Sequence, residues 1–161
     1  MNFKNPIFIV LAIVLSCSGA SAAEAVWPKN SASDLSIFVA SMRFRIYAEY
    51  CSVRVPQLKP QFEILVENLN ARIAGISKGL LATDIFDGMN DKPVPAAIIN
   101  AFEDSLHDSK HNLERREAAS VCPKALQNFG EMDDESLRSD LTDIFTAVQT
   151  MIQNLEKESA R

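Results

Sequence analysis

The sequence is poor in the residues from which most catalytic and cofactor sites are built. It has only five glycines, three cysteines and two histidines among 161 residues. It contains no glycine-rich loop of the kind that cradles phosphates. The spacings Cys-x-x-Cys and Cys-x-x-Cys-His are also absent, which removes the usual signatures of redox or zinc sites and of covalently attached haem. We therefore expect a protein that is not an enzyme and that carries no cofactor.

The sequence also lacks an excess of positive charge and, beyond its N-terminal segment, any long apolar run. Acidic residues outnumber basic ones by 21 to 16, which gives a net charge of −5. An acidic surface without a basic stripe does not attract the phosphates of nucleic acids. The sequence therefore predicts no nucleic-acid binding and no transmembrane segment in the mature chain.

The N-terminal segment has the features of a signal peptide. One basic residue, Lys4, precedes an apolar run over residues 6–15, which is too short to span a bilayer comfortably. Residues 20–22, Ala-Ser-Ala, match the small-x-small pattern of a cleavage site. We therefore expect residues 1–22 to be removed and the mature protein to be periplasmic or secreted. An alternative is lipoprotein anchoring at Cys17, but the residues before this cysteine fit that pattern poorly.

After this segment, apolar residues recur at three- and four-residue steps, the period of a helix that buries one face. We expect a flexible leader over residues 23–33 and a helical domain over residues 34–161. The domain contains four apolar stripes. They predict helices from about Ser33 or Asp34 to Ser52, from Pro56 or Pro60 to Leu80, from Pro95 to an interruption at Cys122-Pro123 with a short continuation to Gly130, and from Asp133 onwards.

Four amphipathic helices with no predicted strand indicate an all-α fold, an antiparallel up-and-down four-helix bundle. Cys51 and Cys122 are the two cysteines that remain after the expected cleavage, and an even count in an exported protein favours a disulfide. They lie near the ends of the first and third expected helices, which an up-and-down order places at the same end of the bundle. We therefore predict one interhelical disulfide between them, with free buried thiols as the alternative.

Two segments are candidates for contact with a partner protein. The connection over residues 83–94 is long for a small bundle and holds apolar residues among polar ones. These apolar side chains either fold back as a lid over the end of the bundle or face solvent as a contact patch. The second candidate is the acidic start of the fourth helix. The candidate partner-binding residues are Ile85, Phe86, Asp87, Met89, Asp133, Asp134 and Glu135.

The histidines form a weak candidate for a metal site. His107 and His111 lie four residues apart on the third expected helix, a spacing at which two imidazoles can share an ion. Glu103 and Glu114 lie close to the same face. The histidines fall beside the apolar stripe of this helix, so a solvated polar face is the alternative and no metal is predicted.

These observations favour an exported, non-catalytic protein-binding module, such as a periplasmic inhibitor or immunity protein or a subunit of an envelope complex. Its partner is expected to be another envelope or secreted protein. One alternative is a carrier of a small apolar ligand, lined by aromatic residues of the first two helices. A metal-binding protein that uses His107 and His111 is a weaker alternative. The sequence does not indicate the oligomeric state.

Overall fold

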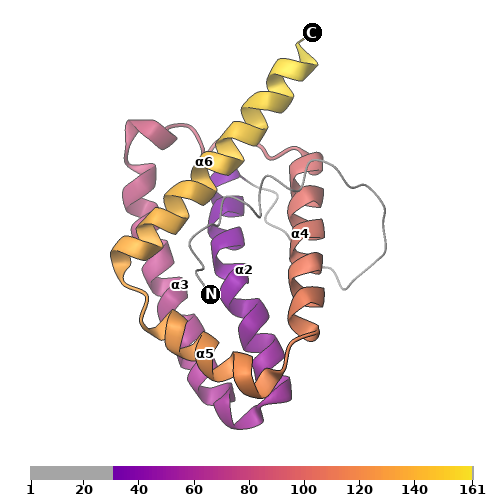
Figure 1. The fold of residues 1–161 in the computed structure, drawn as a ribbon. Helices are drawn as coiled ribbons and strands as arrows, with labels where there is room; N and C mark the ends of the chain where they lie inside the picture. The colour runs from indigo at the N-terminus through magenta and orange to yellow at the C-terminus, as the bar shows by residue number, and fades with distance from the viewer. Residues whose placement is uncertain (1–30, 161) are drawn as a thin grey trace.

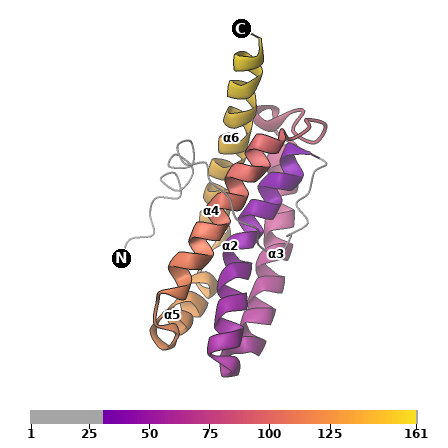
Figure 2. The same ribbon diagram turned by 90° about the vertical axis from the view of Figure 1, so that its right-hand side faces the viewer.

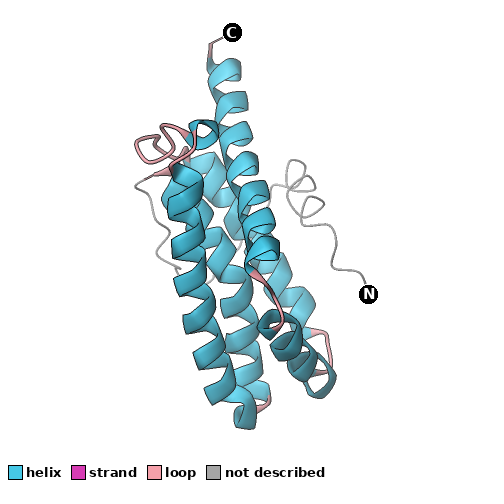
Figure 3. Ribbon diagram, turned by 90° about the vertical axis from the view of Figure 1, so that its left-hand side faces the viewer, coloured by secondary structure: helices cyan, strands magenta, loops and turns pink. Residues whose placement is uncertain are grey.

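The computed structural model describes residues 31–160, and this part of the chain contains helices and connecting turns but no strand (Figure 3). The expectation of an all-α fold is therefore confirmed. The five α-helices of the described residues are α2 (Ala32–Arg54), α3 (Lys59–Leu81), α4 (Ala96–Glu114), α5 (Ala118–Gly130) and α6 (Asp134–Ser159), and two short 3₁₀ helices are η2 (Pro56–Leu58) and η3 (Asp84–Phe86).

The helix α2 lies at the centre of this arrangement. In Figure 1, α3 runs along one side of α2 and α4 along the other, while α5 and α6 cross in front. The view from the side shows α2 and α3 packed together as a long hairpin (Figure 2). Because α2 contacts all four other α-helices, its buried side chains point in several directions, as expected for a helix that is apolar on most of its circumference. They include Leu35, Ala40, Met42, Phe44, Ile46 and Cys51.

The number of helices differs from the expected four. The break that the sequence placed at Cys122-Pro123 lies at residues 115–117, and Pro123 sits inside α5. Glu117 has an extended backbone, with φ −72° and ψ 111°, so the chain changes direction there. Proline removes one backbone donor from a helix without always ending it. The helix α5 then crosses from the end of α4 to the start of α6 (Figure 1), and the expected third helix is corrected to two helices.

Local signals placed the other helix ends well, apart from the start of α2. As expected, α5 ends at Gly130, and Asp133 caps α6. The cap of α2 is Ser31 and not the expected Ser33 or Asp34, because the Ser31 Oγ accepts the backbone N–H of Asp34 at 3.1 Å. Residues 31–33 are buried, so they belong to the folded domain and not to the expected leader.

The expected signal peptide, its cleavage site and the alternative lipidation site all lie outside the described residues. Within residues 31–160, no helix is both long enough and apolar enough to cross a bilayer.

The core consists of one large cluster and two smaller ones. The large cluster joins α2, α3, α4 and α6 around side chains that are almost completely buried, among them Phe44, Leu69 and Phe145. One smaller cluster surrounds the two cysteines, whose Sγ atoms lie 2.07 Å apart across a sequence separation of 71 residues. The predicted Cys51–Cys122 pair is therefore confirmed. Its second cysteine lies in α5, so the bond links the central helix to the crossing helix.

Loss of this bond is expected to destabilise the fold without changing its helices. A Cys51→Ser substitution opens the covalent loop, which lowers the free energy of unfolding by at most about 4 kcal/mol in the chain-entropy model. Urea unfolding followed by circular dichroism measures the difference. Reduction by a thiol reagent is the matched control, because it should weaken the wild-type protein and leave Cys51→Ser unaffected. Equal stability of the oxidised wild type and the variant would show that the bond contributes nothing.

Candidate functional site

The loop between α3 and α4 was the first predicted contact segment, and its apolar side chains divide into two kinds. Phe86 and Met89 are 2% and 1% exposed and belong to the large core cluster. The Phe86 ring packs edge-on against Phe145 of α6, with ring centroids 5.3 Å apart. Ile85 is 70% exposed. Of the two interpretations of this loop, burial therefore favours the lid, because Phe86 and Met89 can touch a partner only by leaving the core.

The same loop also caps the central helix. The first backbone N–H groups of a helix have no partner within it. Here the Ala32 N–H donates to the Lys92 carbonyl at 2.9 Å, and the Ser33 N–H donates to the Met89 carbonyl at 3.2 Å. The Ser33 hydroxyl donates to Asn90 Oδ1 at 2.7 Å. These bonds join the loop to the start of α2, so its backbone has a structural role.

Gly88 allows the loop to turn between its two buried side chains, Phe86 and Met89. Its φ of +76° lies in the left-handed region, which side chains with a Cβ rarely adopt. The glycine separates exposed Asp87 from buried Met89. The turn therefore leaves Asp87 and Ile85 as the two predicted contact residues of this loop whose side chains are accessible.

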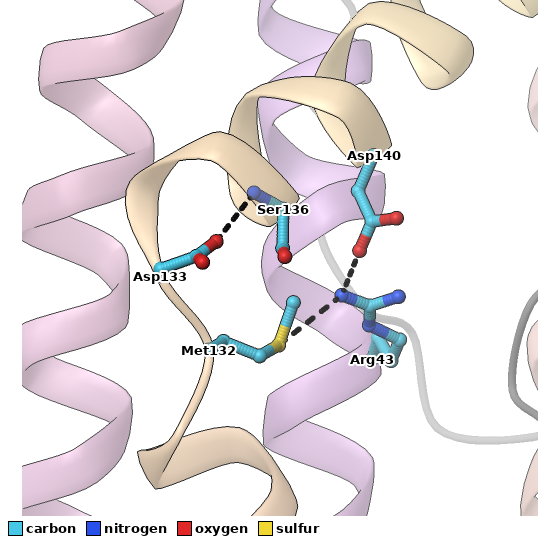
Figure 4. Close-up of polar contacts among 5 residues, drawn as sticks. All are labelled: Arg43, Met132, Asp133, Ser136 and Asp140. Atoms are coloured by element: carbon cyan, nitrogen blue, oxygen red, sulfur yellow. Dashed lines mark hydrogen bonds and ion pairs between the residues drawn. The ribbon is translucent and has the colours of Figure 1, made fainter.

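The acidic start of α6, the second predicted contact segment, is also used inside the molecule. Asp133 accepts the backbone N–H of Ser136 at 2.7 Å, as an N-cap (Figure 4). Asp134 accepts from Arg72 Nε at 2.7 Å, and the same guanidinium donates to the Met132 carbonyl at 2.7 Å. Glu135 is exposed, with no hydrogen bond or ion pair to the described residues. Two of the three acids therefore position α6.

A second arginine holds the same turn from the opposite side. Arg43 of α2 donates from Nη2 to Asp140 Oδ2 at 2.6 Å, and the same nitrogen lies 3.9 Å from the Met132 sulfur (Figure 4). Arg43 and Arg72 come from the two helices of the hairpin. They therefore fix the direction in which α6 leaves α5.

The two predicted contact segments do not form one surface. Gln149 of α6 donates to the Ile85 carbonyl at 3.2 Å, so the loop lies beside the middle of α6. Residue 149 is 16 positions beyond Asp133, which corresponds to about 24 Å along a helix at 1.5 Å per residue. A single compact partner site that contains both segments is therefore not present.

The metal candidates lie together on α4 but have no shared geometry for an ion. His111 Nε2 lies 2.7 Å from Arg115 Nη2, so the guanidinium occupies one of its nitrogens and adds positive charge beside it. Glu103, His107 and Glu114 are exposed. No group of three metal-ligating side chains occurs anywhere in residues 31–160. This part of α4 is therefore a polar helix face that is exposed to solvent.

A surface groove that the sequence did not indicate lies between α2 and α3. It is shallow and open, with a volume of about 500 Å³. Helical periodicity describes one helix at a time, whereas this hollow is formed between two helices, so no local signal marks it. The residues that line the groove are Arg45, Ala48 and Glu49 of α2 and Phe62, Glu63, Val66, Glu67 and Asn70 of α3.

The groove combines an apolar floor with a rim of mostly negative charge. Phe62 is fully buried beneath it. Three glutamates and one arginine line it, an excess of two negative charges. Glu49 pairs with Lys110 of α4 at 3.5 Å and Glu63 with Lys59 at 3.8 Å, but both glutamate side chains are 63% exposed. Exposed pairs of this kind are weak and exchange readily with water, so the carboxylates remain accessible.

One polar atom of the groove has no hydrogen-bond partner. Asn70 lines the end of the groove on α3, and its Oδ1 is buried without a donor among the described residues. Two other atoms share this property, Arg43 Nε and Ser77 Oγ, but neither lines the groove. A buried acceptor without a donor is costly, because it has lost its water and gained no bond.

The two buried side chains of the α3–α4 loop, Phe86 and Met89, are expected to contribute to the stability of the fold and not to partner binding. Met89→Ala should lower the free energy of unfolding by about 2–5 kcal/mol, because it leaves a cavity in the core. Ile85→Ala, in the same loop but exposed, is the matched control and should change it by less than about 0.5 kcal/mol. Chemical unfolding of the two variants tests the lid. Similar losses in both variants would contradict it.

The cap of α6 is expected to make stability depend on acid. The backbone N–H of Ser136, then its side chain, and the nearby Arg72 charge keep the pKa of Asp133 below its ordinary value of 3.8. A lowered pKa in the folded state gives stability that is present above the unfolded-state pKa and lost as the pH falls. Asp133→Asn keeps a capping oxygen without the charge.

Wild type should therefore be more stable than Asp133→Asn near neutral pH, and the difference should vanish as the pH falls below about 4. Thermal unfolding across this range measures it. Glu103→Gln, an exposed change on α4, serves as the control and should show no such convergence. A difference that is constant with pH would mean that the Asp133 charge does not contribute.

Comparison with known proteins identifies no relative of this chain. No family model matches it, and neither a curated protein nor a solved structure is significantly similar to it.

Proposed function

We propose that this protein is an exported, non-catalytic protein-binding module, such as a periplasmic inhibitor or immunity protein or a subunit of an envelope complex. The observation that carries the proposal is the open groove between α2 and α3, with its apolar floor and charged rim. Protein contacts typically combine an apolar centre with a polar edge. Its partner is another envelope or secreted protein.

The groove is built on a rigid base, which favours binding without rearrangement. Phe62, the buried floor residue, belongs to the same small cluster as Cys51 and Cys122. The disulfide therefore ties the helix hairpin to α5 directly beneath one part of the groove. A surface that is already in its bound shape loses less conformational entropy on association.

Export is proposed from the N-terminal segment together with the cysteine pair. The apolar run over residues 6–15 and the Ala-Ser-Ala sequence at 20–22 are typical of a cleaved signal. A buried disulfide suits an oxidising compartment. The acidic chain, with a net charge of −5, is suited to a basic partner.

The carrier of an apolar ligand is the second candidate, because a volume of about 500 Å³ is large enough for a small molecule. Its aromatic candidates, however, are used in packing. Phe44 and Tyr47 both pack edge-on against Phe129, at 5.0 and 5.2 Å. Tyr50 donates its hydroxyl to the Arg116 carbonyl at 2.6 Å. The open, charged groove favours a polypeptide over an apolar molecule.

Site-specific crosslinking in cells tests the proposal. A photoreactive residue in place of Glu67, in the groove, is expected to form one stoichiometric adduct with another polypeptide. The same residue in place of Glu158, at the far end of α6, should form none. Native mass spectrometry of the protein from its own envelope fraction then reports the mass of the partner, cleavage after Ala22 and lipid on Cys17.

Two results would overturn this function. A small bound molecule that raises the melting temperature, with no crosslinked polypeptide, would favour the carrier. A bare protein with no crosslink at either position would reject the groove as a binding surface.

A further inference from the structure

We infer that the α2–α3 groove receives a cationic, amphipathic segment of polypeptide, with an apolar residue on the floor and lysine or arginine at the rim. This inference deepens the proposed function and rests on it. It specifies the chemistry of the partner from the floor and the rim of one groove.

The arrangement of the rim favours a cation. Glu63 and Glu67 lie four residues apart on the same face of α3. Like charges at this spacing destabilise a helix slightly. Lys59, one turn before Glu63, forms the 3.8 Å pair with that glutamate, and Glu67 has no ion pair among the described residues. A cation placed between the two carboxylates would relieve their repulsion.

The opposite side of the groove adds one further carboxylate. Glu49 of α2 contributes to the rim, and Arg45, one turn before it, is the single base among the lining residues. Lys59 and Lys110 offset two of the three carboxylates through exposed, weak ion pairs. The attraction of the rim for a cationic segment therefore rests mainly on Glu67, which has no ion pair among the described residues, and on the exchange of these weak pairs. Complementary charge of this kind determines partner choice and association rate more than affinity.

The floor specifies the rest of the segment. Ala48 and Val66 offer an apolar surface between the charged edges, and Phe62 is fully buried beneath it. An apolar side chain of the occupant is therefore expected between the carboxylates.

The size of the groove limits the occupant to a short segment. Its α3 residues run from Phe62 to Asn70, eight positions or about 12 Å along the helix. This length matches two turns of a helix or about four residues of an extended chain. A second copy of this protein is a poor occupant, because both chains are acidic and would repel each other.

A pair of designed peptides tests the inference on the purified, oxidised protein. Both are amphipathic helices of about 14 residues with the same leucines, and they differ only in having lysine or glutamate beside them. Fluorescence anisotropy should detect binding of the lysine peptide alone. Raising the salt from about 50 to about 300 mM should weaken that binding, because exposed charges are screened.

Matched variants separate the groove from the general negative charge of the protein. The double substitution E63Q/E67Q is expected to lower the affinity for the lysine peptide by about tenfold. E135Q/E158Q removes the same charge elsewhere on the surface and should leave the affinity within about twofold. V66S should weaken binding while the salt dependence remains. Melting temperatures confirm that each variant is folded.

Equal binding of both peptides, or equal losses in both double variants, would overturn the cationic assignment. Absence of peptide binding together with a polypeptide crosslinked at residue 67 would reject this chemistry and leave the protein-binding function standing. Absence of both would reject the function as well. Each negative result therefore contradicts either the cationic assignment alone or both the assignment and the protein-binding function.

Discussion

Burial of α2 on most of its circumference is the constraint on which the rest of this structure depends. A helix with apolar residues on several sides is stable in water only when other elements cover those sides, and α2 contacts all four other described α-helices. Its two ends are held by different means. Carbonyls of the α3–α4 loop accept its first N–H groups, and Cys51 ties its last turns to α5. The loop and the disulfide therefore each hold one end of α2 in place.

The ion pairs at the start of α6 follow from the same arrangement. Because α6 must cross α2 and α3, its first turn lies where arginines from both helices can reach it. Arg43 pairs with Asp140, and Arg72 pairs with Asp134 and the Met132 carbonyl. Acids that would attract a partner if they were unpaired instead orient a helix, so acidic composition alone does not mark a contact site. An acidic side chain near the start of a helix orients that helix when an arginine lies within hydrogen-bonding distance, as Arg72 does for Asp134.

The groove differs from these features because its groups are not fully used inside the molecule. Its carboxylates are paired weakly or not at all with the described residues, and Asn70 Oδ1 lacks a donor. Buried and interior polar groups elsewhere are mostly satisfied, as native structures require. A surface with an apolar floor and carboxylates that are paired only weakly or not at all is therefore the part of this molecule with the most unused binding capacity.

The sequence by itself determined the helical class, the ends of several helices and the pairing of Cys51 with Cys122, because these depend on local periodicity, on capping chemistry and on an even cysteine count. It did not determine that Pro123 lies inside a helix or that Phe86 and Met89 are buried, because an apolar residue in a polar loop has the same local pattern whether it faces the core or solvent. The separation of the loop from Asp133, and the groove lined by α2 and α3, were decided only by tertiary structure, since both depend on how distant helices cross and no single segment contains that information.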